Sequence, residues 1–122
     1  MYPGAVTRAD DLTPPFYSQA QADRGADVYR DNCATCHGEH LNDGGFARAL
    51  KGAAFRREWN GKTLSALGQL ILSKMPPGKA GQLTPEQYAD VIAFLVSANG
   101  VKAGGSDLPS DPVTWERLAA LE

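Results

Sequence analysis

Five consecutive residues in the first third of the chain have the types and the spacing to do chemistry. They read Cys33-Ala34-Thr35-Cys36-His37, the C-x-x-C-H pattern of covalent haem attachment. Two thiols one helical turn apart can each form a thioether with one of the two vinyl groups of a single porphyrin. The imidazole of His37 is then placed to bind the iron. The sequence therefore predicts one haem c, an iron cofactor, held by Cys33 and Cys36.

Two other uses of these cysteines compete with haem attachment. A thioredoxin-like dithiol pair belongs near a βαβ pattern, and the sequence contains no convincing strand. A zinc site could use both cysteines together with His37 and His40. The neighbouring Cys36 and His37 would then have to bind one ion, unlike the usual arrangement with a distant second pair of ligands. The pattern favours haem over both alternatives.

A second axial ligand is sought among the methionines and histidines, because cytochromes use Met or His. With Met1 set aside, Met75 and His40 remain. His40 lies three residues after His37 and is too close along the chain to reach the opposite face of a haem. Met75 can reach that face through the intervening residues, and the two prolines that follow it would stiffen its loop. We therefore expect Met75 to be the second ligand.

Three helices are predicted to position these residues. Each begins at a Ser or Thr that can cap its first turn, and each continues with apolar residues at helical spacing. We expect them over residues 19–32, which lead into the cysteines, from Leu64 to the prolines at 76 and 77, and from Pro85 to Asn99-Gly100. The glycine-rich segment 40–60 is expected to be an irregular loop around an apolar group.

Length and charge exclude several classes of protein. A chain of 122 residues suffices for one small domain and excludes a multidomain enzyme. Its net charge of -2 provides no overall basic field for nucleic acid or anionic lipid, and no apolar run is long enough for a membrane span. Residues 37–80 nevertheless hold seven basic and three acidic side chains, so we expect this segment to steer an acidic partner surface.

Taken together, the motifs resemble the monohaem class I c-type cytochromes, in particular small bacterial cytochromes and the cytochrome domains of quinoprotein dehydrogenases. The resemblance covers about residues 19–100. It rests on Gly25 and Tyr29, Cys33-Ala34-Thr35-Cys36-His37-Gly38, Met75-Pro76-Pro77-Gly78, Leu83-Thr84-Pro85-Glu86-Gln87-Tyr88 and Ile92-Ala93-Phe94-Leu95.

The resemblance implies an all-α cytochrome c fold, with three main helices and long loops around one covalent haem. Its first and last helices would cross where Gly25 and Tyr29 meet Phe94 and Leu95. The resemblance also implies that His37 is the proximal ligand and that its second ring nitrogen bonds a backbone carbonyl. Many relatives use a proline carbonyl, but no proline lies between residues 37 and 76, so the acceptor is expected near residues 44–52.

Three residues are candidates to bind the haem propionates. Trp59 could donate its indole N–H, and Arg56 and Arg57 could offer guanidinium groups. The alternative for each arginine is a solvated surface charge.

Flanking segments are expected on either side of the cytochrome c domain, residues 18–100. Residues 1–17 carry three prolines and no helical periodicity, which predicts an extended arm that lies on the surface or is disordered. Residues 101–122 are expected to form a tail that packs on the domain, with a short helix near 115–121. Met1 and Leu121-Glu122 match ends that cloning adds and are left out of the interpretation.

The function implied is one-electron transfer by a monomeric carrier that is soluble and not an enzyme. Its partners would be redox proteins, a dehydrogenase as donor or an oxidase as acceptor. The family is exported, so we expect the periplasm, although the chain carries no signal peptide. Two alternatives stay open. One is a ligand sensor or weak peroxidase with a displaceable Met75, and the other is an electron-transfer domain excised from a larger quinoprotein dehydrogenase or oxidase.

Overall fold

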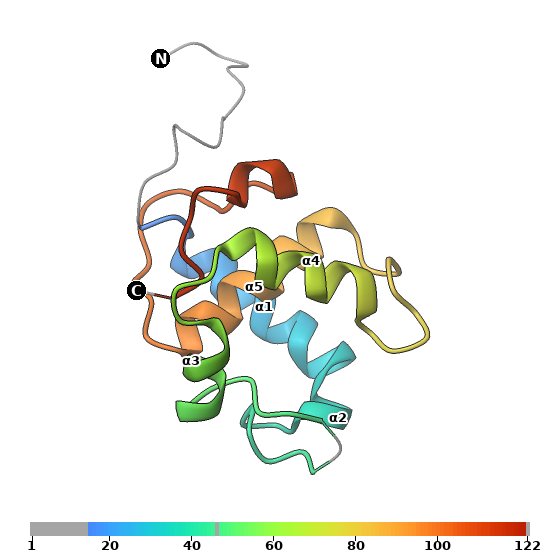
Figure 1. Cartoon of the computed structure of the whole chain (residues 1–122). Helices are drawn as coiled ribbons and strands as arrows, with labels where there is room; N and C mark the ends of the chain where they lie inside the picture. Colours follow the sequence, from blue (N-terminus) through green and yellow to red (C-terminus); the bar gives the residue numbers. More distant parts are fainter. Residues whose placement is uncertain (1–14, 46, 122) are drawn as a thin grey trace.

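Caps encoded in the sequence begin three long helices in the computed structural model, which describes residues 15–45 and 47–121 (Figure 1). The helices are α1 (Gln19–Asn32), α4 (Leu64–Lys74) and α5 (Pro85–Ala98). The hydroxyl that precedes each helix accepts a hydrogen bond from a backbone N–H of the first turn. The three predicted helices are therefore confirmed, and so is the all-α fold. Among the described residues, none of the helices has the length and apolarity that crossing a membrane requires.

Two short helices lie between α1 and α4. Helix α2 (Ala34–His37) is a single turn, and helix α3 (Ala53–Trp59) has seven residues. The expectation of an irregular loop over 40–60 is wrong for α3. Its start at Gly52 offers no capping side chain, so the usual sequence signal is absent. Burial of Phe55 and Trp59 on one face stabilises this helix instead.

Helices α1 and α5 cross in close contact (Figure 1). Gly25 lies at this contact. A Cβ atom at this position would lie 1.9 Å from the carbonyl oxygen of Asp90 and 2.9 Å from the Cβ of Phe94. One turn further on, the rings of Tyr29 and Phe94 pack with their centroids 5.4 Å apart. The predicted glycine and aromatic contact between the first and last helices is therefore confirmed.

The segment before α1 contributes to the core. Phe16 and Tyr17 are buried, so the expectation of a surface arm is wrong at these residues; residues 1–14 of that arm lie outside the described part of the chain. The Tyr17 carbonyl accepts from the N–H of Gly104 at 2.7 Å, and the Tyr17 hydroxyl donates to the carbonyl of Val101. Large aromatic side chains bury enough apolar area to hold such a short segment in place.

Residues 101–121 pack across α4 and α5. Trp115 is fully buried against Gly68, where a Cβ would lie 2.5 Å from its ring, and the Trp115 indole donates to Pro109. The helix in this segment is a 3-10 helix, η2 (Pro112–Trp115), which precedes the predicted position. Leu121 is only 4% exposed and belongs to the same core.

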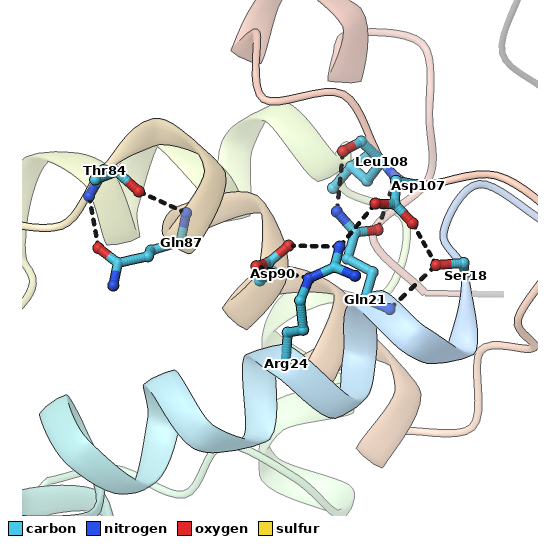
Figure 2. Close-up of polar contacts among 8 residues, drawn as sticks. All are labelled: Ser18, Gln21, Arg24, Thr84, Gln87, Asp90, Asp107 and Leu108. Atoms are coloured by element: carbon cyan, nitrogen blue, oxygen red, sulfur yellow. Dashed lines mark hydrogen bonds and ion pairs between the residues drawn. The ribbon is translucent and has the colours of Figure 1, made fainter.

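Polar side chains attach this C-terminal segment to α1 (Figure 2). The buried amide of Gln21 donates to the carbonyl of Leu108 at 3.0 Å and accepts from its N–H at 2.7 Å. Arg24 pairs with Asp90 of α5 and with Asp107, at 3.3 and 2.7 Å. One turn of α1 therefore contacts both α5 and the tail.

Gly25→Ala should destabilise the protein by about 2 kcal/mol or more, because the new methyl overlaps the α5 backbone, which cannot move alone. Chemical denaturation of the purified protein measures the change. The matched control is Gly105→Ala, since a Cβ at Gly105 meets no atom within 4 Å. Equal stability of the two variants would contradict the close crossing.

Asp107 should contribute to the acid sensitivity of folding. The Ser18 hydroxyl and the Arg24 guanidinium hold the pKa of this carboxyl below its ordinary value. The carboxyl has a lower pKa in the folded state than in the unfolded state. It therefore stabilises the fold at pH values above its unfolded-state pKa, and this stabilisation is lost as the pH falls through its folded-state pKa. Asp107→Asn should therefore lose stability less steeply than the parent between about pH 5 and pH 3, measured by denaturant midpoints.

The control for this experiment is Asp31→Asn, which removes an exposed carboxylate from α1, away from the contact with the tail. If Asp107→Asn and the parent lose stability equally as the pH falls, the contact between α1 and the tail is not the source of this pH dependence.

Candidate haem-binding site

The C-x-x-C-H residues lie where α1 ends. Cys33 terminates α1 and begins the single turn α2, in which the N–H groups of Cys36 and His37 donate to the Cys33 carbonyl at 3.2 and 3.0 Å. This turn places the two thiols three residues apart on one helical face. Both cysteines and His37 line one cavity.

That cavity has a volume of about 620 Å³, within the range of cofactor sites. Most of its lining is apolar and comes from four helices: Tyr29 of α1, Phe55 and Trp59 of α3, Leu67, Leu70 and Ile71 of α4, and Val91 and Leu95 of α5. Such walls exclude water from a flat apolar group. The sequence leads us to expect that a loop, residues 40–60, surrounds an apolar group. In the structure, helices form most of the walls of this cavity.

His37 is buried, with 6% of its surface exposed, and is held in one orientation. Its Nδ1 lies 2.8 Å from the carbonyl oxygen of Arg48. A carbonyl can only accept, so Nδ1 carries the proton and Nε2 keeps a lone pair for a metal. The acceptor lies within the predicted segment 44–52.

The segment that follows the C-x-x-C-H motif packs closely against it. A Cβ at Gly44 would lie 2.0 Å from the carbonyl oxygen of Cys36, so only glycine fits there. The Tyr29 hydroxyl donates to the carbonyl of Gly38 at 2.6 Å. Burial, reinforced by Cys33 and Asp43, raises the pKa of Tyr29 to about 12, which keeps its hydroxyl protonated as a donor.

Met75 lines the same cavity from the end of α4. It is the residue after the last turn, and its N–H donates to the carbonyl of Ile71 at 2.9 Å. Its side chain is half-buried, and the two prolines after it also line the cavity. His40, the other candidate, is exposed and bonds Asp43 at 2.8 Å.

The structure brings one of the three predicted propionate ligands to the cavity. Trp59 lines it, whereas Arg56 and Arg57 are exposed and do not. Phe55 and Trp59 are four residues apart and occupy the buried face of α3, and Arg56 and Arg57 lie on its exposed side. Arg56 instead donates to the carbonyl of Asn99.

The basic side chains that line the cavity are Arg48 and Lys74. Arg48 pairs with Glu58, which also lines the cavity, at 2.6 Å. Sequence reasoning missed all three of these residues. The helical period of α3, counted from Phe55 and Trp59, could have excluded the two predicted arginines, but no sequence signal identifies Arg48.

The donor set fits a covalently held haem better than a reactive dithiol. Burial, together with the neighbouring Cys36, raises the pKa of the Cys33 thiol to about 11. Dithiol oxidoreductases instead need a lowered thiol pKa. Two thiols, one oriented imidazole and one thioether share an apolar chamber, which is the set of groups that haem c requires.

Comparison with known proteins decides the family. A family model described as cytochrome c oxidase, cbb3-type, subunit III matches residues 20–95. The chain belongs to this cytochrome c family. Membership implies haem c and electron transfer with redox partners, and the resemblance inferred from the motifs is confirmed.

Two curated relatives are similar to this cytochrome c. A protein named cytochrome c-553-like, from Synechocystis sp., is 30% identical over 86 residues, which cover 66% of the chain and 77% of the relative. Quinohemoprotein alcohol dehydrogenase ADH-IIG from Pseudomonas putida is 30% identical over 118 residues, which cover 93% of the chain but only 15% of the dehydrogenase. No solved structure matches the chain significantly.

Haem should stay on the chain when the mature protein is denatured in acidified organic solvent, because thioether bonds survive unfolding. The double variant Cys33→Ala/Cys36→Ala should release its haem, whereas Thr35→Ala, inside the same motif, should retain it. Intact-mass measurement after denaturation distinguishes the two. Release of haem from the parent protein would contradict covalent attachment.

Proposed function

We propose that this cytochrome c is a one-electron carrier with a single haem c, bound through Cys33 and Cys36, with His37 and Met75 as axial ligands. The observation that carries the proposal is the apolar cavity lined by all four side chains. A haem bound there would supply an iron that changes oxidation state by one electron. Two protein ligands leave no open iron position for a substrate, which favours outer-sphere transfer over catalysis.

The chain's own residues hold the ligands and exclude water. The carbonyl of Arg48 fixes the His37 imidazole in the tautomer that leaves Nε2 free. The helix end at Lys74 and the following prolines fix the backbone of Met75. Apolar side chains of α4 and α5 close the chamber, which raises the energetic cost of a charged iron site and so favours the reduced form.

Polar side chains at the cavity support a proposal for the propionates. The indole N–H of Trp59 makes no hydrogen bond with another described residue and is not a buried unpartnered group, so it is available at the cavity. Arg48 and Lys74 supply positive charge at the same cavity. We assign propionate binding to these three residues, and we assign Arg56 and Arg57 to the solvated surface.

We further propose that the partners are redox proteins that present an acidic surface to the basic segment 37–80. Electrostatic attraction of this kind accelerates encounter and weakens with added salt. Because c-type cytochromes of this kind are exported, the proposed location is the periplasm.

A second candidate function has specific support. The match to the quinohaemoprotein alcohol dehydrogenase extends over 93% of the chain, including the C-terminal segment, at 30% identity. The chain could therefore perform the same electron-transfer role next to a quinoprotein dehydrogenase unit. The haem chemistry would be identical, and only the donor would differ.

Visible spectroscopy of the ferric protein tests the ligand assignment. The weak far-red band that reports a methionine sulfur on ferric iron should be present in the parent and absent from Met75→Ala. The ferrous form of that variant should bind carbon monoxide, because it has an open iron position. His40→Ala, the matched control for the rejected ligand, should keep the band.

Two results would contradict a carrier in which Met75 binds the iron. A far-red band that persists without Met75 would contradict the assignment. Carbon monoxide binding by the parent protein would favour a ligand sensor or weak peroxidase over a closed carrier.

A further inference from the structure

The loop that follows Met75 is exposed and sparsely bonded. Residues 77–82 all lie on the surface, between the end of α4 and the cap of α5. Within the loop, the N–H of Lys79 donates to Pro76 at 2.8 Å and that of Gln82 donates to Lys79 at 3.0 Å. These are local turns, and neither ties the loop to a helix. Loops of this kind open at low free-energy cost.

One buried hydroxyl ties both ends of this loop to the core. The Tyr88 O–H donates to the carbonyl of Met75 at 2.8 Å, and the same oxygen accepts from the N–H of Gly81 at 2.9 Å. Tyr88 itself is only 2% exposed. A single side chain thus closes the segment from Met75 to Gly81 into a ring.

The position of that hydroxyl is fixed by α5. Tyr88 lies in the first turns of the helix, directly after the Thr84 capping box, in which Thr84 and Gln87 bond each other's backbone at 3.1 and 2.9 Å. The next turn carries Val91, which lines the haem-binding cavity. Tyr88 therefore moves with the helix that forms one wall of the site.

We propose that Tyr88 is a positioning residue that keeps the Met75 sulfur at the iron by fixing the backbone from which that side chain extends. The proposal rests on the proposed ligation by Met75. Displacement of the sulfur by an external ligand requires the loop to move outward, and that movement breaks the bond from the Tyr88 hydroxyl to the Met75 carbonyl. The hydroxyl stabilises only the closed state, so it lowers the fraction of molecules with Met75 off the iron.

The two residues next to Met75 cannot replace this bond. Pro76 and Pro77 have no N–H groups, so neither can donate to the Met75 carbonyl. Without the Tyr88 hydroxyl, the part-buried Met75 carbonyl would lose its donor and Gly81 its acceptor. Opening the loop to water would satisfy both groups, which favours the open state.

Imidazole binding to the ferric holoprotein tests the proposal. Tyr88→Phe removes the hydroxyl and keeps the ring, and it should tighten imidazole binding about five- to thirtyfold and weaken the far-red band. The matched control is Tyr17→Phe, which removes another buried hydroxyl that donates to a backbone carbonyl, that of Val101, away from the cavity. Met75→Ala sets the affinity expected when no sulfur competes.

The outcomes separate this inference from the proposed function. Unchanged imidazole affinity in Tyr88→Phe, with a normal far-red band in the parent, would overturn the positioning role alone. Equal tightening in Tyr17→Phe and Tyr88→Phe would also overturn it, because a general loss of stability would then explain the effect. A parent protein that binds imidazole as tightly as Met75→Ala would instead overturn ligation by Met75 itself.

Discussion

The close crossing of α1 and α5 at Gly25 determines where the other parts of the site can lie. Since α1 runs directly into Cys33, its angle against α5 sets the position of both thiols and of His37. Helix α5 contributes Val91 and Leu95 to the lining of the same chamber, and these two residues pack in one cluster with Tyr29 and Cys33. A bulkier residue at the crossing would separate the attachment motif from the wall against which the haem must pack.

The sequence predicts well those features that depend on local side chains. Helix starts follow from hydroxyl caps at Ser18, Thr63 and Thr84, because a cap satisfies donors within its own turn. The C-x-x-C-H motif can also be recognised from the sequence, since few residue types can perform its chemistry, and the structure places Met75 at the same cavity. Helix α3 escaped prediction because it begins at Gly52 without a cap and depends on tertiary burial.

Features that depend on the backbone or on distant contacts could not be predicted in the same way. The carbonyl of Arg48 orients His37, but every residue has a carbonyl, and only the path of the loop selects this one. The burial of Tyr17 and Trp115 likewise depends on segments far apart in the sequence. For the predicted propionate ligands, the residue types were suitable, but the phase of α3 turned Arg56 and Arg57 to the solvent.

Orientation of His37 by a main-chain oxygen has an evolutionary consequence. A hydrogen bond at Nδ1 makes the imidazole a stronger electron donor, which in the proposed ligation would favour the oxidised iron and offset the preference of a thioether for the reduced one. The strength of that donation depends on the fold of the loop, whereas the Arg48 side chain points to Glu58 and the surface. Mutation at position 48 can therefore change the charge beside the cavity and the pairing with Glu58, while the hydrogen bond to the His37 imidazole, which needs only the main chain, is kept.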